Sequence, residues 1–361
     1  MRLQLPSIAM TAMPPSPPAP PDSPPAPERK RRTASITVND VARLAGLSAM
    51  TVSRAINTPD RLPPATLAKV RAAIASTGYV PNLLAGGLRS NKSRLVAALV
   101  PTLVSPVFNE TIQALTTALR LQGYQLMLGQ TGYADPLEDE LLGAIIGRRP
   151  DGIVLTGVVH SADARRRLQA LGIPVVETWD LTPEPIDMLV GFSHTAVADA
   201  VCRYLHSRGR QRLAVIGGDD ERAQRRSQAF VATALSLGLP EPLVHVVPAP
   251  TTLGSGRTGL RALRSHSAEF DAVFCSSDLL ALGVLTEAQA LGITIPDQLA
   301  VVGFGDLAFA RDLHPALTTV RIDGTRIGTE AARCIVDRVE GRPVPERMVD
   351  IGFSIIERAS V

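Results

Sequence analysis

Residues 37–57 read TVNDVARLAGLSAMTVSRAIN, and this stretch decides the architecture of the N-terminal part of the chain. Thr37 and Asp40 have the spacing of a capping box at a helix start, and Gly46 allows the positive φ that ends a short helix. Ser48 is of a residue type that caps a second helix. The stretch therefore predicts two short helices joined by a tight turn.

A third helix follows, and all three have an apolar inner face. The predicted inward residues are Val41, Leu44 and Ala45 in the first helix, Val52, Ala55 and Ile56 in the second, and Leu67, Val70 and Ile74 in the third, which stops at Gly78. The residues left on the outside of the second helix are Ala49, Met50, Thr51, Ser53 and Arg54. Short side chains near a helix start, with an arginine for phosphate or guanine, suit a DNA major groove. The sequence thus predicts a helix-turn-helix DNA-reading unit.

Charge is divided unevenly along the 361 residues, whose net charge is only +3. Residues 1–94 hold 13 Lys and Arg against 4 Asp and Glu, which leaves 24 against 30 in the rest. A basic segment followed by an acidic one is expected when only the first meets phosphates. Residues 13–27 are mostly Pro, Ala and Ser, and we interpret 1–35 as a disordered leader whose basic run at 28–32 is a solvated tail.

The helix-turn-helix stretch resembles the LacI family of bacterial regulators. The family pattern D-V-A-x-x-A-G-x-S-x-x-T-V-S-R-x-x-N is matched at Asp40, Val41, Ala42, Ala45, Gly46, Ser48, Thr51, Val52, Ser53, Arg54 and Asn57. The match continues at 78–82 and at Ala85, Leu88 and Arg89. The resemblance implies a DNA-binding domain at 36–80 and a hinge helix at 81–92, with a homodimer reading a two-fold operator.

The same resemblance implies which side chains meet DNA. They are Thr37, Ser48, Ala49, Met50, Thr51, Ser53, Arg54, Asn57, Tyr79, Asn82, Ala85, Leu88 and Arg89. Ala49 and Met50 take the base-reading positions, and Leu88 is the apolar wedge that enters the minor groove. Two departures stand out: Gly86 and Gly87 replace the usual Arg-Ser and weaken the hinge helix, and Pro63 replaces a serine cap.

From residue 93 onward the pattern is that of an α/β fold. Apolar runs at 95–100, 125–128, 152–155, 174–176, 213–216, 272–274 and 300–302 alternate with amphipathic stretches at 109–122, 161–171, 195–208 and 278–291. This alternation favours parallel sheets covered on both faces, here two doubly wound lobes. The resemblance implies a periplasmic-binding-protein-like ligand-binding and dimerisation domain over 93–361. Its N-lobe is expected at about 95–191 plus 322–342, and its C-lobe at about 192–321 plus 343–361.

Within the family the chain is most similar to the gluconate-utilisation repressors, through blocks such as 123–125, 174–177 and 220–222. This similarity points to a sugar acid in the cleft between the lobes. Such a ligand needs oxygen acceptors for its hydroxyls, an apolar wall and a fixed cation. The candidate residues are Ser105, Phe108, Tyr133, Glu177, Trp179, Arg222, Arg226, Asp278 and Asp306. One or two of the arginines at 222, 225 and 226 must be solvated, and Asp278 could instead cap a helix.

Other functions find little support in the sequence. The GxGxxG match at 254–259 stands six residues beyond the preceding apolar run, so we interpret its glycines as a flexible helix entrance and not as a dinucleotide site. No nucleophile elbow, H-E-x-x-H or P-loop pattern occurs, and Cys202, Cys275 and Cys334 lack metal-ligand spacing, so we expect no enzyme activity, cofactor or metal.

The remaining alternatives keep the DNA-reading unit. One is a neutral sugar as the effector, and another is a purine-type corepressor. A periplasmic sugar-binding protein is disfavoured because no signal peptide is seen and such a protein has no use for residues 37–90. No apolar run is long enough to span a bilayer, so we expect a cytoplasmic regulator without a membrane partner.

Overall fold

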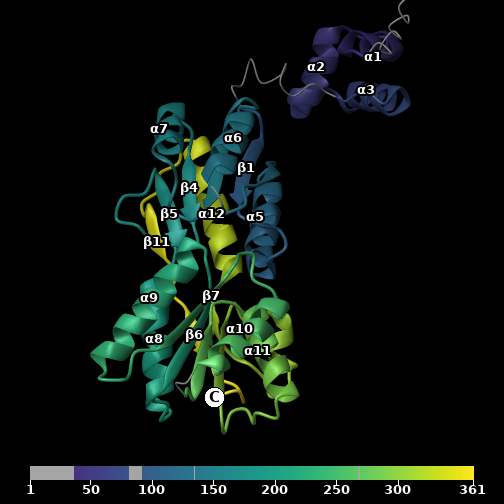
Figure 1. The fold of residues 1–361 in the computed structure, drawn as a ribbon. Helices are drawn as coiled ribbons and strands as arrows, with labels where there is room; N and C mark the ends of the chain where they lie inside the picture. The colour runs from purple at the N-terminus through teal and green to yellow at the C-terminus, as the bar shows by residue number, and fades with distance from the viewer. Residues whose placement is uncertain (1–35, 81–91, 134, 267–268) are drawn as a thin grey trace, which may run out of the picture. The chain divides into compact units, whose positions relative to one another are not determined.

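The computed structural model describes residues 36–80, 92–133, 135–266 and 269–361. These fall into two compact units, a small N-terminal one and a large C-terminal one (Figure 1). The predicted leader and, apart from Lys92, the predicted hinge helix lie outside the described residues. The same holds for four residues predicted to contact DNA, namely Asn82, Ala85, Leu88 and Arg89.

The small unit is a three-helix bundle. Its elements are α1 (Val38–Ala45), α2 (Ala49–Asn57), the short 3-10 turn η1 (Pro59–Arg61) and α3 (Pro64–Thr77). Gly46 and Gly78 end α1 and α3 with a φ of 65° each, a conformation that favours glycine. The prediction of three helices with a glycine stop after the first and third is confirmed.

The core of the small unit is made of short side chains. Val41 and Val52 are fully buried, and Ala42 is 5 % exposed. The inward position predicted for Leu44 is wrong, because this side chain is 58 % exposed. The buried stripe of α1 runs through Val41, Ala42 and Ala45, and at 100° per residue Leu44 lies beside that stripe.

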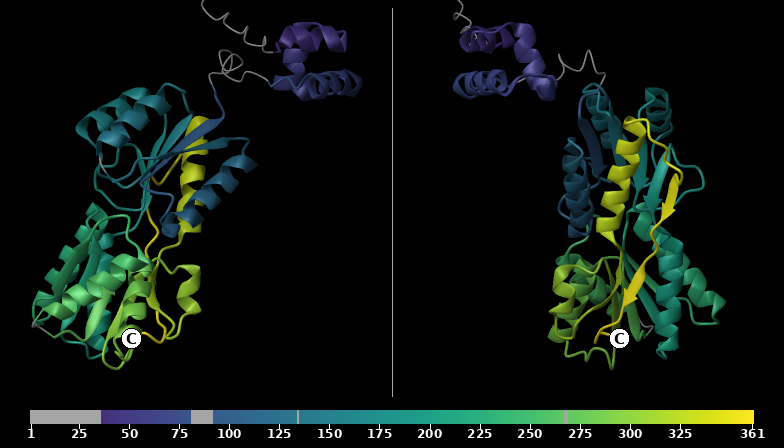
Figure 2. Two further views of the ribbon diagram at one scale, coloured as in Figure 1. Left: turned by 45° about the vertical axis from the view of Figure 1, so that its right-hand side comes forward. Right: turned by 180° about the vertical axis from the view of Figure 1, so that it is seen from behind.

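The large unit contains two six-stranded sheets (Figures 1 and 2). In sheet order, the first holds β11 (Met348–Asp350), β5 (Met188–Gly191), β4 (Val175–Thr178), β3 (Gly152–Thr156), β1 (Leu95–Val100) and β2 (Gln125–Gln130). The second holds β12 (Ser354–Ile356), β10 (Thr318–Arg321), β9 (Ala300–Phe304), β8 (Ala272–Cys275), β6 (Leu213–Gly218) and β7 (Leu243–Val247). All pairings are parallel except that between β10 and β12.

Helices cover both faces of each sheet, as Figure 2 shows. They are α5 (Asn109–Leu121), α6 (Asp135–Ile146), α7 (Ala162–Leu171) and α12 (Gly324–Val339) in the N-lobe, and α8 (His194–Ser207), α9 (Glu221–Ser236), α10 (Leu253–Ser265) and α11 (Asp278–Ala290) in the C-lobe. Two further short 3-10 turns are η2 (Pro106–Phe108) and η3 (Ala308–Arg311). The predicted α/β architecture of two doubly wound lobes is confirmed.

Strand β1 shows why the sequence forms this arrangement. Alternate residues of a strand point to opposite faces, so an apolar run on both registers requires cover on both sides. Val96 and Ala98 pack in the cluster that includes α5 and α12, whereas Ala97 and Leu99 pack with residues of α6 and α7. The continuous apolar sequence of this strand is therefore buried between two helical layers.

The C-terminal end of the chain corrects the expected lobe boundary. We expected residues 343–361 to belong to the C-lobe, but β11 extends the first sheet beside β5, and the Leu189 amide donates to the Arg347 carbonyl. Only β12 joins the second sheet, antiparallel to β10. Because β11 satisfies the open edge of β5, the third crossing between the lobes lies between Asp350 and Ser354.

The glycines of the GxGxxG match lie inside α10 and do not form a flexible entrance. A Cβ at Gly256 would overlap the Leu280 carbonyl oxygen, and one at Gly283 would overlap the Leu253 carbonyl oxygen. These two glycines let α10 and α11 pack backbone against backbone, so the expectation of flexibility is wrong.

Within the described ranges, no helix combines the length and apolar character that crossing a membrane requires.

Candidate DNA-binding face and ligand cleft

Caps fix the two helices of the helix-turn-helix. The Thr37 amide and hydroxyl donate to Asp40 Oδ2 at 3.0 and 2.7 Å, and these bonds lower the pKa of Asp40. At the start of α2, Ser48 Oγ accepts from the Thr51 amide at 3.1 Å and lies 2.9 Å from its hydroxyl oxygen. Thr37 and Ser48, both predicted to contact DNA, thus also set where the helices begin.

The outer face of α2 carries the predicted base-reading side chains. Met50 is 57 % exposed and Arg54 is exposed, while Ala49, Thr51 and Ser53 are partly exposed. An apolar side chain one turn before a guanidinium can contact a thymine methyl group and a phosphate or guanine. Of two further predicted positions, Tyr79 is partly buried and packs against the core of the small unit, and the side chain of Asn57 lies outside the described part.

The large unit has a cleft between its two lobes. Its inner part is lined by six of the nine predicted ligand residues: Ser105, Phe108, Tyr133, Trp179, Arg222 and Arg226. The sequence did not indicate the others, which are Val107, His194, Asp220, Thr251, Ser276, Ser277 and Phe304. Asp220 belongs to the block 220–222 that carried the family similarity, so its segment was recognised while its role was not.

The N-terminus of α9 supplies two cations to the inner cleft. Arg222 and Arg226 are four residues apart and share one face of the helix. Arg225 points elsewhere and pairs with Asp180 at 2.9 Å and with Glu221 at 2.6 Å. Of the three clustered arginines, two therefore face the cleft, where Arg222 Nε lies 3.9 Å from Asp220 Oδ1, and the third is held in two shorter ion pairs.

Arg226 is nearly buried, with only 5 % of its surface exposed, and its guanidinium is held rigidly. Its Nη1 lies 2.9 Å from His194 Nδ1, its Nη2 donates to the Ser276 carbonyl at 3.2 Å, and its guanidinium stacks 4.2 Å from the centre of the Phe304 ring. Burial lowers the pKa of Arg226 to about 10, so it is charged at neutral pH. No carboxylate lies within ion-pair distance of it among the described residues.

Two guanidinium nitrogens in this cleft have no hydrogen-bond partner. Arg226 Nε and Arg222 Nη1 are both buried and unsatisfied within the described part of the chain. A buried donor without an acceptor is costly, and a buried charge without a counter-ion more so. The inner cleft thus has the donors and the charge to bind an anion.

His194 is uncharged and lies between the two lobes. Burial and the nearby Arg226 and Arg222 hold the pKa of His194 well below its usual value. Because a guanidinium can only donate, His194 Nδ1 accepts from Arg226. The other ring nitrogen, Nε2, then carries the proton and donates to the Trp179 carbonyl at 2.9 Å. The ring fixes the direction of the Arg226 guanidinium.

Aromatic rings form the apolar wall of the cleft. Trp179 packs edge-on against Phe108 at 5.0 Å and against Phe192 at 5.9 Å, and Phe192 lies 6.2 Å from Phe304. The indole nitrogen donates to Thr111 Oγ1 at 3.1 Å. Trp179 has a φ of 67°, a left-handed conformation that is strained for a bulky residue. Such strain is often found at ligand sites, where it orients a side chain.

We expected Glu177 to line the cleft, but it does not. It is fully buried, its Oε2 accepts from the Ile186 amide at 2.6 Å, and its Oε1 lies 3.5 Å from His160 Nε2. Alternate side chains of a strand face opposite ways, and the Glu177 side chain, in β4, points into the N-lobe.

Asp278 and Asp306 are likewise bound within the C-lobe. Asp278 is fully buried and accepts from Thr319 Oγ1 at 2.5 Å and from the Leu307 amide at 2.7 Å. Burial raises the pKa of Asp278 to about 6. Asp306 pairs with Arg358 at 2.7 Å. Ser277, not Asp278, caps α11, so neither reading of Asp278 from the sequence describes its role, which is to tie three segments together.

The outer part of the cleft is acidic. It shares Tyr133, Asp220 and Arg222 with the inner part, so the two parts are continuous. Four more carboxylates line it, namely Glu138, Asp180, Asp219 and Glu221. Carboxylate oxygens accept hydrogen bonds from hydroxyls. The cleft therefore offers a cationic and aromatic inner end and an outer end rich in acceptors.

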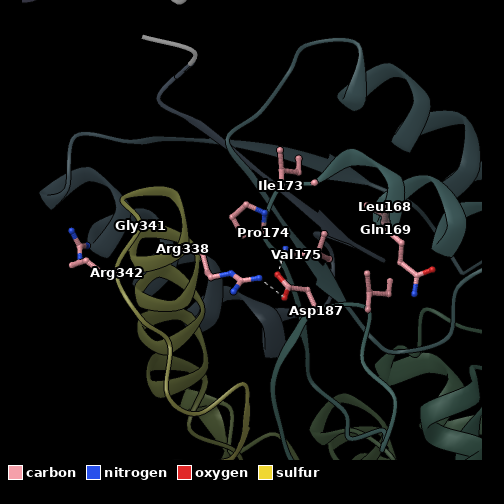
Figure 3. Close-up of a pocket in the computed structure, with 11 residues that line it drawn as sticks. Leu168, Gln169, Ile173, Pro174, Val175, Asp187, Arg338, Gly341 and Arg342 are labelled. Carbon is pink, nitrogen blue, oxygen red and sulfur yellow. Dashed lines mark hydrogen bonds and ion pairs between the residues drawn. The ribbon is translucent and has the colours of Figure 1, made fainter.

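A second hollow lies on the N-lobe, away from the cleft (Figure 3). In the close-up Arg338 reaches Asp187 at 3.1 Å across this surface. Arg342, at its margin, is paired with Asp337 at 2.8 Å. Because these cations already have partners, the hollow lacks the unsatisfied donors that distinguish the cleft.

Comparisons with known proteins agree with this geometry. Residues 37–82 match the description "Bacterial regulatory proteins, lacI family", and residues 202–361 match a periplasmic binding protein-like domain. The chain is 35 % identical over 332 residues to the HTH-type transcriptional regulator GntR of Pseudomonas aeruginosa, covering 91 % of this chain and 97 % of that protein. The chain belongs to the lacI family.

Further LacI-family proteins are similar over nearly their whole length. GntR of Escherichia coli K12 is 31 % identical, with 90 % of this chain and 98 % of that protein covered. A solved LacI-family regulator from Silicibacter pomeroyi is 32 % identical with a TM-score of 0.85, covering 90 % and 99 % of the two chains. The protein is a DNA-binding transcriptional repressor and not an enzyme. Members of its family bind operator DNA and small effectors, typically as dimers.

Proposed function

We propose that this repressor controls genes of sugar-acid catabolism and that an acid of the gluconate type in the cleft controls its affinity for the operator. The observation that carries the proposal is the pair of buried, unsatisfied guanidinium nitrogens on Arg222 and Arg226. A carboxylate would satisfy both with charge-assisted hydrogen bonds. The aromatic wall and the acidic outer cleft suit the C–H face and the hydroxyls of such an acid.

The proposed response is a shift in population. The cleft is formed by both lobes, so a ligand that binds one arrangement of the lobes more tightly favours that arrangement. In a homodimer this would change how the two DNA-binding units, and the hinge segments at 81–92 that precede the lobes, fit the two halves of an operator. The site of action is DNA, and we therefore place the protein in the cytoplasm.

On DNA, we propose that α2 enters the major groove. Met50 and Ala49 would read base edges, and Arg54 would contact a phosphate or guanine. Affinity for a duplex selected by the protein from random sequence should fall steeply as salt rises, because phosphate contacts release counter-ions. A salt-independent affinity would contradict this mode of binding.

Calorimetry on the full-length protein tests the effector. Gluconate, 2-ketogluconate and galactonate are compared with the neutral polyol glucitol and with guanine. We expect heat from at least one acid and a matching change in affinity for the selected duplex. Tighter binding of glucitol would favour a neutral sugar, and heat from guanine alone would favour a purine corepressor. Either result, or no heat from any acid, would overturn the assignment.

A further inference from the structure

We propose that Glu138 is a specificity-determining contact for the hydroxyl chain of the effector, and that the buried pair His160 and Glu177 positions it. The inference rests on the proposed function, because it concerns the far end of the same ligand. Glu138 was not indicated by the sequence, and His160 had no neighbour in the sequence that suggested a partner.

Glu138 is the outermost member of a line of three charged groups. His160 Nδ1 lies 2.6 Å from Glu138 Oε1, and His160 Nε2 lies 3.5 Å from Glu177 Oε1. The side chains of His160 and Glu177 are 1 % and 0 % exposed, whereas that of Glu138 is 20 % exposed. Although burial lowers it, the hydrogen bond to Glu138 and the ion pair with Glu177 raise the pKa of His160 to about 9. A charged imidazolium thus donates to a carboxylate that reaches the cleft.

A second contact fixes the same two segments. Ser161 Oγ donates to Asp139 Oδ1 at 2.8 Å and accepts from the Ala164 amide at 3.0 Å, which caps α7. Adjacent residues of α6, Glu138 and Asp139, are therefore tied to adjacent residues of the loop after β3. These contacts fix the position of Glu138, and a residue that discriminates between ligands needs such a fixed position.

The charge balance leaves Glu138 free to accept from a ligand. A carboxylate has about four lone-pair sites, and His160 uses one of them. His160 lies between Glu138 and Glu177, so this set holds two acidic side chains for one basic side chain. Glu138 lines the outer cleft, which is continuous with the arginine pair through Tyr133 and Arg222. An acid whose carboxylate binds the arginines would direct its hydroxyl chain toward Glu138.

The first test compares two acids of different length. Gluconate has a hydroxyl chain that can extend into the outer cleft, whereas glycerate has the same carboxyl end and a chain too short to do so. We expect Glu138→Gln to weaken gluconate about tenfold and to leave glycerate unchanged within about twofold, since a charged acceptor becomes a neutral one. Glu140→Gln, an exposed residue of the same helix, is the matched control and should change neither.

A double-mutant cycle tests positioning by His160. We expect His160→Gln to reduce the preference for gluconate over glycerate in the wild-type background but not in the Glu138→Gln background. A loss of the same size in both backgrounds would show a merely structural effect. An unchanged preference in Glu138→Gln, with gluconate still bound by the wild type, would overturn the inference alone. Failure of the wild type to bind either acid would overturn the proposed function together with it.

Discussion

Replacing Arg226 by methionine separates the charge of this site from its shape. Methionine keeps an unbranched apolar stem against the Phe304 ring, but it removes the donors to His194 and Ser276 and the unsatisfied Nε. A hydrogen bond to a charged group contributes about 1.5–3 kcal/mol. The affinity for gluconate should therefore fall roughly 10- to 150-fold. Glucitol has no carboxylate and should lose less than about threefold.

The effect of Arg226→Met on the free energy of unfolding is smaller than the loss of its hydrogen bonds alone would suggest. The variant leaves His194 Nδ1 and the Ser276 carbonyl without a donor, at a cost of about 1–3 kcal/mol for each buried group. It also removes a charge whose burial is unfavourable, as the lowered pKa of Arg226 shows, so the two effects oppose one another. Urea unfolding would measure the balance, and a variant that stays folded can be used for calorimetry.

The control lies one residue away on the same helix. Arg225→Met removes the ion pair with Asp180 and leaves the inner cleft intact, so the preference for gluconate over glucitol should be retained. Equal losses of gluconate and glucitol in Arg226→Met would refute the role of Arg226 as counter-ion. The measurement therefore decides between charge recognition and simple packing.

Two further predictions concern stability. Gly283→Ala should destabilise the large unit by about 1–3 kcal/mol in urea unfolding, because its Cβ would overlap the Leu253 carbonyl oxygen. Gly143→Ala, at an exposed position of α6, is the control and should not destabilise it. A Gly283 variant as stable as the wild type would contradict the close helix contact. The Lys92 ammonium, 2.7 Å away, helps hold the pKa of Glu340 at about 2, below its usual 4.5. The stabilisation is thus present above pH 4.5 and is lost as the pH falls toward 2, and Glu340→Gln should show a smaller drop in Tm over that window. A drop equal to that of the wild type would refute the coupling.

Local patterns explain why so much of the fold could be predicted. Caps, glycine stops and apolar periodicity each act over a few residues, and the first three helices follow from them. Strand β1 begins and ends where its apolar run does, at Leu95 and Val100. The shorter edge strands β11 and β12 were not predicted, because their three residues carry too little pattern and form only where a neighbouring strand offers free main-chain groups.

The candidate site was predicted only in part. Arg222 and Arg226 could be expected to share a face because helical spacing fixes their relation. The contacts of His194 with Arg226 and of His160 with Glu138 join residues 32 and 22 positions apart, which no local pattern indicates. Proposing Glu177 as a direct ligand contact identified a carboxylate that the structure buries in the N-lobe and does not place in the lining of the cleft.

The linear chain by itself determined the helix-turn-helix, the alternation of strands and helices, and the family. Each depends on interactions between residues that are close in the sequence, or on motifs formed by such residues. Only the tertiary structure decided which carboxylates reach the cleft and which are turned inward to main-chain amides and buried partners. That choice depends on how the strands are paired and how the two lobes meet, because these decide toward which side of a sheet a side chain near a strand end points.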